Sequence, residues 1–262
     1  MRRIVLIATA LGVLVAAGAA YAAINTYSAT LKFASKKPGT TAKPVATSFT
    51  QDIKAAGTSG NRTAVLLDIK TTIYGLKVDG KDFPVCKESS IIAAGADTGC
   101  PKGAEVASGH ITASIGSKTN FGASGTPCDP LLDVWNSGQG KLTFFFVDTP
   151  THQCVAGAIT TGKVGPYAST YKNVGKNLVV DVPIPTYVDF PLPGVAGSLE
   201  TEHLVWKSTS AKVKGKTVSS IASVACSGSK RPYSTTFKAN LPSSTGGAGT
   251  TETSSVKGSA PC

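Results

Sequence analysis

Hydrophobic and polar residues alternate along most of this chain. Three early runs show the alternation most clearly, and the members that share one face are Tyr27, Ala29, Leu31 and Phe33; Val65, Leu67, Ile69, Thr71 and Ile73; and Ile111, Ala113 and Ile115. A period of two predicts β-strands that bury one face. The continuous apolar run 142–147, which holds three Phe, predicts a strand buried on both faces.

The same pattern continues at 154–160, 178–184, 204–208, 218–226 and 233–241. Turns that contain glycine separate these segments, at Asp79-Gly80, Asn136-Ser137-Gly138, Lys214-Gly215 and Ser227-Gly228. Short strands joined by such turns are typical of a sandwich or a barrel. We predict an all-β fold, a mostly antiparallel β-sandwich of jelly-roll or immunoglobulin-like type, over residues 23–241. Only 89–96 and 130–135 have patterns that suit a helical turn.

The first residues have the pattern of an export signal. Two arginines at 2–3 precede an apolar run over 4–20, and Ala20-Tyr21-Ala22 has the small residues of a cleavage site. This pattern predicts a signal peptide over 1–22, cleaved after Ala22 or Ala23, with an uncleaved membrane anchor as the alternative. Because no second long apolar run follows, we expect a secreted or envelope-associated protein with no transmembrane segment in the mature chain.

All six cysteines lie beyond the predicted signal, at Cys86, Cys100, Cys128, Cys154, Cys226 and Cys262. An even number in an exported protein predicts disulfides, and the wide spacing argues against a zinc site. Six cysteines allow 15 connectivities, and we favour sequential pairing because it closes the shortest loops. The segment 242–262 is rich in Ser, Thr and Gly, which predicts an irregular tail that Cys262 would pin to the domain.

The chain is basic, with 26 Lys and Arg against 15 Asp and Glu, a formal net charge of +11. Lys212, Lys214 and Lys216 occupy alternate positions and would line one face of a strand. With Lys230 and Arg231 they form a candidate binding site for an anionic cell-envelope polymer. The alternative, which we favour, is protection of an exposed strand edge against aggregation. Because Lys predominates and no aromatic residues interleave these charges, we expect no nucleic-acid partner.

Residues that could carry catalysis are scattered. The three histidines, His110, His152 and His203, share no spacing, and we interpret them as ordinary strand or surface residues. Glu200 and Glu202 would share one face of a strand, which we interpret as a solvated face rather than a metal site. The segment 227–230 matches a Ser-x-x-Lys motif but lacks its partner motifs. We therefore predict no catalytic residue, no metal site and no cofactor.

Three motifs stand in the first half of the chain: Gly60-Asn61-Arg62, Phe83-Pro84-Val85-Cys86, and Cys-Pro-Lys-Gly-Ala-Glu-Val-Ala-Ser-Gly over 100–109. They resemble the Gly-x-Arg, Phe-Pro-x-Cys and Cys-Pro-x-Gly-x-x-Val-Gly-x-Gly motifs of a family of exported β-rich proteins from high-GC Gram-positive bacteria. The resemblance covers about residues 39–116 and extends to 226–237, although Ala107 replaces a family glycine and Asp79 a usual Asn. It implies export, β structure and a Cys86–Cys100 bridge, and it implies no activity.

These features together predict a secreted, non-catalytic binding or structural protein of the cell envelope or the extracellular space. Two alternatives stay open: an extracellular hydrolase acting on polysaccharide or peptide, and a carrier of a small apolar ligand. A hydrolase needs a concave pocket where at least two polar groups converge. A carrier needs a cavity lined by apolar side chains. The sequence names neither a ligand nor an oligomeric state.

Overall fold

The computed structural model describes residues 24–154, 165–243 and 249–262. The predicted signal peptide over 1–22 and its cleavage positions lie outside these residues. Within them, no helix is long and apolar enough to cross a membrane.

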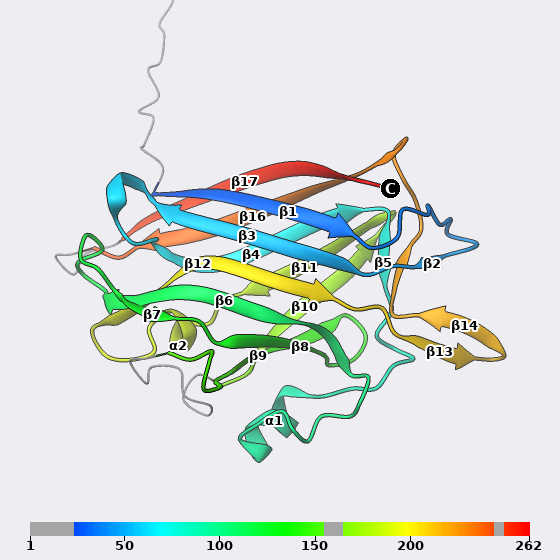
Figure 1. Cartoon of the computed structure of the whole chain (residues 1–262), viewed down its shortest axis with the longest axis horizontal. Helices are drawn as coiled ribbons and strands as arrows, with labels where there is room; N and C mark the ends of the chain where they lie inside the picture. The colour runs from blue at the N-terminus through cyan, green and yellow to red at the C-terminus, as the bar shows by residue number, and fades with distance from the viewer. Residues whose placement is uncertain (1–23, 155–164, 244–248) are drawn as a thin grey trace, which may run out of the picture.

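One twelve-stranded antiparallel sheet makes up most of the fold (Figure 1). In spatial order its strands are β1 (Asn25–Phe33), β3 (Phe49–Gly57), β12 (Val195–Trp206), β6 (Glu105–Ser117), β8 (Leu131–Asn136), β9 (Lys141–Val147), β10 (Tyr167–Val174), β11 (Asn177–Pro183), β4 (Val65–Tyr74), β16 (Lys230–Leu241) and β17 (Thr250–Pro261), and β7 (Thr126–Cys128) pairs with β6. Consecutive strands pair from β8 to β11 and at β16–β17, whereas β12 with β3 and β6, and β4 with β11 and β16, join distant parts of the sequence.

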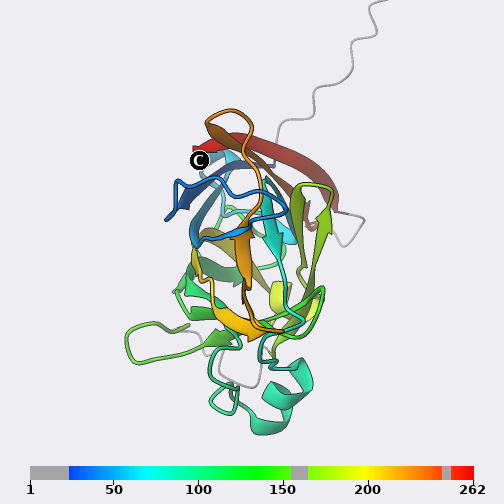
Figure 2. The ribbon, with the colours of Figure 1, turned by 90° about the vertical axis from the view of Figure 1, so that its right-hand side faces the viewer.

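The sheet is rolled into a nearly closed barrel. Strands β1, β3, β12, β6 and β8 form one wall, and the remaining long strands form the other, continuous with it through the pairing of β8 and β9 (Figures 1 and 2). The two ends of the sheet, β1 and β17, lie side by side. The predicted all-β, antiparallel, disulfide-linked fold is confirmed, and the predicted sandwich takes the form of one sheet folded over on itself.

Side chains close the seam between β1 and β17. In the described part of the chain, no backbone ladder joins these two strands. Instead, the Glu252 carboxylate on β17 accepts hydrogen bonds from the backbone N–H groups of Ile24 (2.7 Å) and Asn25 (2.9 Å). The ring of Tyr27 on β1 stacks on Phe237 of β16, with 4.3 Å between ring centroids. The seam is therefore held by a carboxylate at one end and by aromatic packing further along.

Smaller elements cover the two ends of the barrel (Figure 1). One end carries a three-stranded sheet of β2 (Val45–Ala46), β15 (Ile221–Ser223) and β5 (Leu76–Val78). The short helix α2 (Thr186–Asp189) lies at the other end. The remaining elements are the projecting hairpin of β13 (Ser210–Val213) and β14 (Lys216–Ser219), the helix α1 (Glu88–Ala94) and the single turn η1 (Thr58–Gly60).

The barrel interior is filled by the inward members of the alternating runs. Ile111, Ala113 and Ile115 of β6 all belong to the main core, as predicted. In β9, Phe144 and Phe146 face this core, whereas Phe145 faces a second cluster with Trp135 on the other side of the wall. The prediction that 142–147 is buried on both faces is thus confirmed.

A β-bulge in β4 breaks the predicted alternation. The register with β16 skips Leu67, so that this residue has no partner there. Leu66 and Ile69 consequently both face the main core, whereas Val65 and Leu67 belong to a separate cluster. The prediction that Val65 and Leu67 share a face with Ile69 is wrong, because an alternation pattern does not show an inserted residue.

Two further expectations need correction. Residues 250–261 form the strand β17, paired along its full length with β16, so the predicted irregular tail over 242–262 is wrong from Thr250 onward. Polar β-branched residues such as Thr suit an edge strand, where one face stays in water. Residues 130–135, assigned to a helical turn, lie mainly in β8, while α1 falls in the other predicted helical segment.

The cysteines pair sequentially, which confirms the preferred connectivity. The bonds are Cys86–Cys100, Cys128–Cys154 and Cys226–Cys262, with Cα–Cα distances of 5.2, 4.0 and 6.2 Å. The Cys86–Cys100 bond links the two segments that flank α1. The Cys128–Cys154 bond links β7 to the loop after β9, and the Cys226–Cys262 bond links the segment before β16 to the end of β17. The last one fixes the end of β17, as expected for a terminal cysteine that acts as a tether.

Arg62, from the Gly-x-Arg motif, joins the wall of the barrel to the loop that follows β6. Its side chain lies 4.7 Å from the ring centroid of Phe121. Its guanidinium donates hydrogen bonds to the Ser198 hydroxyl and to the backbone carbonyls of Ser117, Asn120, Ala123 and Ala196. The motif residue therefore has a structural role in this fold.

Removing the Glu252 carboxylate should loosen the seam. In Glu252→Ala, the N–H groups of Ile24 and Asn25 lose their charged acceptor, and we expect a loss of about 1–2 kcal/mol in the free energy of unfolding. Urea unfolding under non-reducing conditions measures this loss. The control is Glu200→Ala, which removes an exposed carboxylate and should change stability by less than about 0.5 kcal/mol. Equal stability of the two variants would contradict a role for Glu252 in closing the barrel.

Candidate functional site

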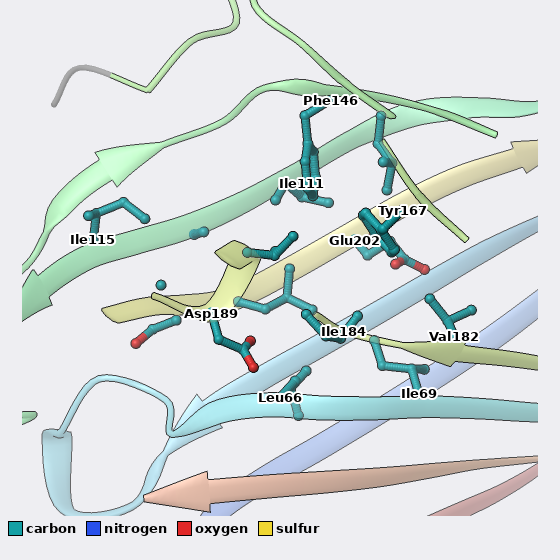
Figure 3. A pocket seen from close by; sticks show the side chains of 16 residues that line it. Leu66, Ile69, Ile111, Ile115, Phe146, Tyr167, Val182, Ile184, Asp189 and Glu202 are labelled. Atoms are coloured by element: carbon teal, nitrogen blue, oxygen red, sulfur yellow. The ribbon is translucent and has the colours of Figure 1, made fainter. Parts of the chain in front are cut away.

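An apolar cavity lies inside the barrel, toward the end that α2 covers (Figure 3). Its volume is about 70 Å³, several times the roughly 10–15 Å³ that a single water molecule needs. Aliphatic and aromatic side chains form most of its wall, among them Ile69, Ile111, Ile115, Phe146, Tyr167 and Val182. The carboxyl groups of Asp189 and Glu202 face the same space. Two acidic groups in an apolar chamber are the unusual chemical feature of this interior.

A β-bulge in β12 turns Glu202 into the cavity. The register with β6 shifts between Leu199 and Thr201, so that Glu200 is the extra residue. Before the bulge Leu199 lines the cavity, and after it Glu202 does, because one inserted residue reverses the alternation. Glu202 is only 8% exposed, and its carboxylate accepts a 2.8 Å hydrogen bond from Gln51 Nε2 on the neighbouring strand β3.

Asp189 is the last residue of α2. The Pro185 carbonyl accepts hydrogen bonds from the N–H groups of Val188 and Asp189, which forms the single turn that aims this side chain inward. Asp189 is 5% exposed, and no side chain or backbone group among the described residues donates a hydrogen bond to its carboxylate. Its side chain lines the cavity.

Burial raises the pKa of both carboxyl groups. The pKa of Glu202 rises from an ordinary 4.5 to about 7, with the hydrogen bond from Gln51 opposing the rise. The pKa of Asp189 rises from an ordinary 3.8 to about 8, with burial as its cause. The pKa of the Tyr167 phenol is also raised, first by burial and then by the charge of Glu202. Near neutral pH the two carboxyl groups can therefore be protonated. A cation that enters the cavity would favour their ionised form and so release these protons.

The interpretation of Glu200 and Glu202 as one solvated face is wrong for Glu202. Glu200 is exposed at the bulge, whereas Glu202 is buried in the interior. The sequence carries no sign of this bulge, because alternation shows only which residues share a face when no residue is inserted. The sequence does not mark Asp189 as a buried residue either, because the short helix that presents it has no periodic pattern.

The three lysines do not share one face of a strand, so that prediction is wrong. Lys212 lies in β13, Lys216 in β14, and Lys214 in the turn between them, with φ of 50° at Lys214 and 77° at Gly215. Positive φ at both turn positions is the geometry of a tight two-residue hairpin. Lys216 pairs with Val213, so Lys212 points to the opposite face of the hairpin. All three lysines remain exposed.

Arg231 cannot contribute to a polyanion site, because it is fully buried. Its guanidinium lies 4.3 Å from the ring centroid of Phe33 and donates a 2.7 Å hydrogen bond to the Ser223 hydroxyl. Lys230, the preceding residue, is exposed. The candidate polyanion site is thus reduced to the hairpin lysines and Lys230.

The three histidines, which share no spacing in the sequence, lie close together in the structure. The His110 ring lies between those of His203 and His152, at 5.6 and 5.9 Å between centroids. They come from β12, β6 and the loop before Cys154, which pairing and a disulfide bring together. As the side chains stand, no three His, Cys, Asp or Glu groups in the described ranges are arranged to hold a metal ion.

Comparison of this chain with known protein families, with curated proteins and with solved structures found no match. The resemblance to an exported family of high-GC Gram-positive bacteria therefore stays a prediction.

The raised pKa values predict that stability falls as pH rises. In the folded chain Glu202 and Asp189 keep their protons up to about pH 7 and 8, whereas in the unfolded chain they release them near their ordinary pKa values. Folding therefore becomes less favourable between about pH 4 and about pH 8, by about 1.4 kcal/mol for each unit of pKa difference. Glu202→Gln should be more stable than the wild type at high pH and should show a smaller slope.

Urea unfolding at a series of pH values measures this slope. Other buried acids, such as Asp133, contribute equally to the wild type and the variant, so the difference between the two isolates Glu202. Glu200→Gln, at the exposed bulge position, should leave the slope unchanged. A pH dependence that is the same in Glu202→Gln and the wild type would show that Glu202 is ionised in the folded chain.

The hairpin lysines should act mainly against aggregation. A Lys212→Gln, Lys214→Gln, Lys216→Gln variant should scatter more light on concentration, because its strand edges lose their repulsion. Its thermal midpoint should be nearly unchanged, since exposed charges contribute little to stability. The matched control replaces the exposed loop lysines Lys36, Lys37 and Lys43 with Gln. Retained solubility with lost retention on anionic wall polymer would instead support the polyanion site.

Proposed function

We propose that this protein is an exported, non-catalytic binding protein whose barrel interior takes a compact ligand with a small apolar body and an amine group. The observation that carries the proposal is the placement of Asp189 and Glu202 in one apolar cavity. The proposal combines the predicted binding protein with the alternative of a carrier for a small apolar ligand. It differs from that alternative in that the ligand also has a positively charged group.

The energetics of the two carboxyl groups support an amine. A buried carboxyl group without a partner is costly when ionised, and a cation beside it removes much of that cost. Glu202 has a single amide partner and Asp189 has none among the described residues, so an ammonium group in the cavity would find a free acceptor on either one. The Tyr167 and Phe146 side chains in the same wall suit the apolar part of such a ligand.

One observation favours the hydrolase alternative, but the size of the cavity weighs against it. Two carboxyl groups near one space are what a glycosidase uses. A sugar chain or a peptide cannot enter a space of about 70 Å³, which is far below the roughly 300–1,000 Å³ of common ligand pockets. A short alkylammonium ion is of the right size.

Secretion or attachment to the cell envelope is part of the same proposal. Its support is the export pattern over 1–22 together with three disulfide bonds, which persist in oxidising compartments. An anionic envelope polymer remains a proposed partner through the exposed lysines of the β13–β14 hairpin.

Calorimetric titration with propylammonium tests the ligand class, with propan-1-ol as the neutral analogue. We expect propylammonium to bind about tenfold more weakly at about pH 6 than at about pH 8.5, because a carboxyl group with a pKa of about 7 is only about one-tenth ionised at the lower pH. Glu202→Gln and Asp189→Asn should each weaken binding by about tenfold or more.

Glu200→Gln is the matched control, because it removes a carboxylate from the same strand outside the cavity. Its affinity for propylammonium should equal that of the wild type. Equal binding of propan-1-ol and propylammonium, unaffected by Glu202→Gln, would contradict the proposed amine and leave an apolar carrier.

A further inference from the structure

All three histidines of the chain lie in one row on the outer wall of the barrel. His203 on β12 and His110 on β6 are directly opposite each other in the antiparallel pair, and His152 lies beyond His110. The three side chains are partly exposed. Because the chain has no other histidine, the whole imidazole content of the protein is concentrated at this point.

The backbone places these side chains closely. Gly109, next to His110, lies so near β12 that a Cβ atom built there would be 1.8 Å from the His203 carbonyl oxygen. A side chain at position 109 would push β6 away from β12 and separate the two rings. His152 is held by a turn with Thr149, whose hydroxyl accepts its N–H at 3.0 Å, and by the Cys128–Cys154 bond two residues further on.

A carboxylate stands at each end of the row. Asp52 on β3 lies opposite His203, with 2.6 Å between Asp52 Oδ1 and His203 Nδ1. Asp129 Oδ2 lies 3.6 Å from His152 Nδ1. His203 is therefore hydrogen-bonded to a carboxylate through Nδ1, whereas His152 Nδ1 faces its carboxylate without a hydrogen bond. No hydrogen bond to the Nε2 atom of either ring is formed by the described residues. The ring nitrogens of His110 have no hydrogen-bond partner among the described residues.

This arrangement has the parts of a transition-metal site. Metal-binding histidines commonly donate the second ring N–H to a carboxylate, which fixes the tautomer and orients the ring. We propose that His203, His110 and His152 form a surface binding site for a divalent transition-metal cation such as Cu²⁺ or Zn²⁺, with Asp52 orienting the ring of His203. Imidazole favours these cations over Mg²⁺ and Ca²⁺, which prefer oxygen ligands.

Binding requires the rings to turn. The imidazoles are tilted by 35° and 36° to their neighbours and do not point at one centre. Side chains that are partly exposed change rotamer within nanoseconds. The strand pairing, the turn at Thr149 and the disulfide restrain the backbone at the three positions, so the proposal requires the side-chain torsions to bring the rings to one centre.

Titration of the mature, oxidised, tag-free protein with Cu²⁺ and Zn²⁺ tests the proposal. We expect one Cu²⁺ per chain, bound more tightly than Zn²⁺, with an electron paramagnetic resonance spectrum that shows coupling to imidazole nitrogen. His110→Gln should lower the affinity by at least tenfold. Asp52→Asn should lower it by about 10–100-fold, since orienting partners have effects of this size.

Val205→Thr is the matched control, because Val205 is an exposed position two residues beyond His203 on the same outer face. It should bind Cu²⁺ as the wild type does, and circular dichroism should show that every variant is folded. Wild-type protein that binds no Cu²⁺ at micromolar concentrations would overturn the proposal. Unchanged affinity in a variant with all three histidines replaced by Gln would overturn it equally.

Discussion

The extra residue at Glu200 is the constraint on which both proposed sites depend. Side chains along a strand alternate between two faces, so one inserted residue reverses every assignment beyond it. Leu199 faces the interior before the bulge, and Glu202 faces it afterwards. Without the insertion, Glu202 would point outward and His203 into the apolar core. The bulge thus allows one strand to present a carboxyl group to the cavity and, at the next position, an imidazole to the outer surface.

The cavity exists because the sheet closes on itself. Among the described residues, contacts of side chains, rather than a backbone ladder, hold the two edges of the sheet together. A backbone ladder would make the barrel wall continuous, whereas here Glu252 and the Tyr27–Phe237 stack join the two edges. The Cys226–Cys262 bond ties the end of β17 to the segment that precedes β16, on the side of β17 away from the seam. A seam of this kind can open locally at a smaller cost than a paired edge, since fewer hydrogen bonds are broken.

Period-two alternation was sufficient to predict the β fold, the core face of β6 and the doubly buried β9, because each depends on local pattern alone. The sequential disulfides were predictable for a related reason: short loops between neighbouring strands are the cheapest to close. The bulges at Leu67 and Glu200 left no mark in composition, and they changed which residues are buried. The histidine row could not be seen either, since its members come from two strands and a loop whose proximity depends on the full strand order.

The cost of the buried acids links the proposed ligand binding to folding. Gln at position 202, or Asn at 189, would avoid the penalty that raises the pKa values of the native groups to about 7 and about 8. A cation in the cavity lowers that penalty only when the carboxyl groups are ionised, so it stabilises the fold most above about pH 8. A ligand that binds only the folded chain adds stability in proportion to the logarithm of its concentration over its dissociation constant. Above about pH 8, the two interior carboxyl groups therefore lower the stability of the empty barrel and, in the proposed function, strengthen its binding of a cation.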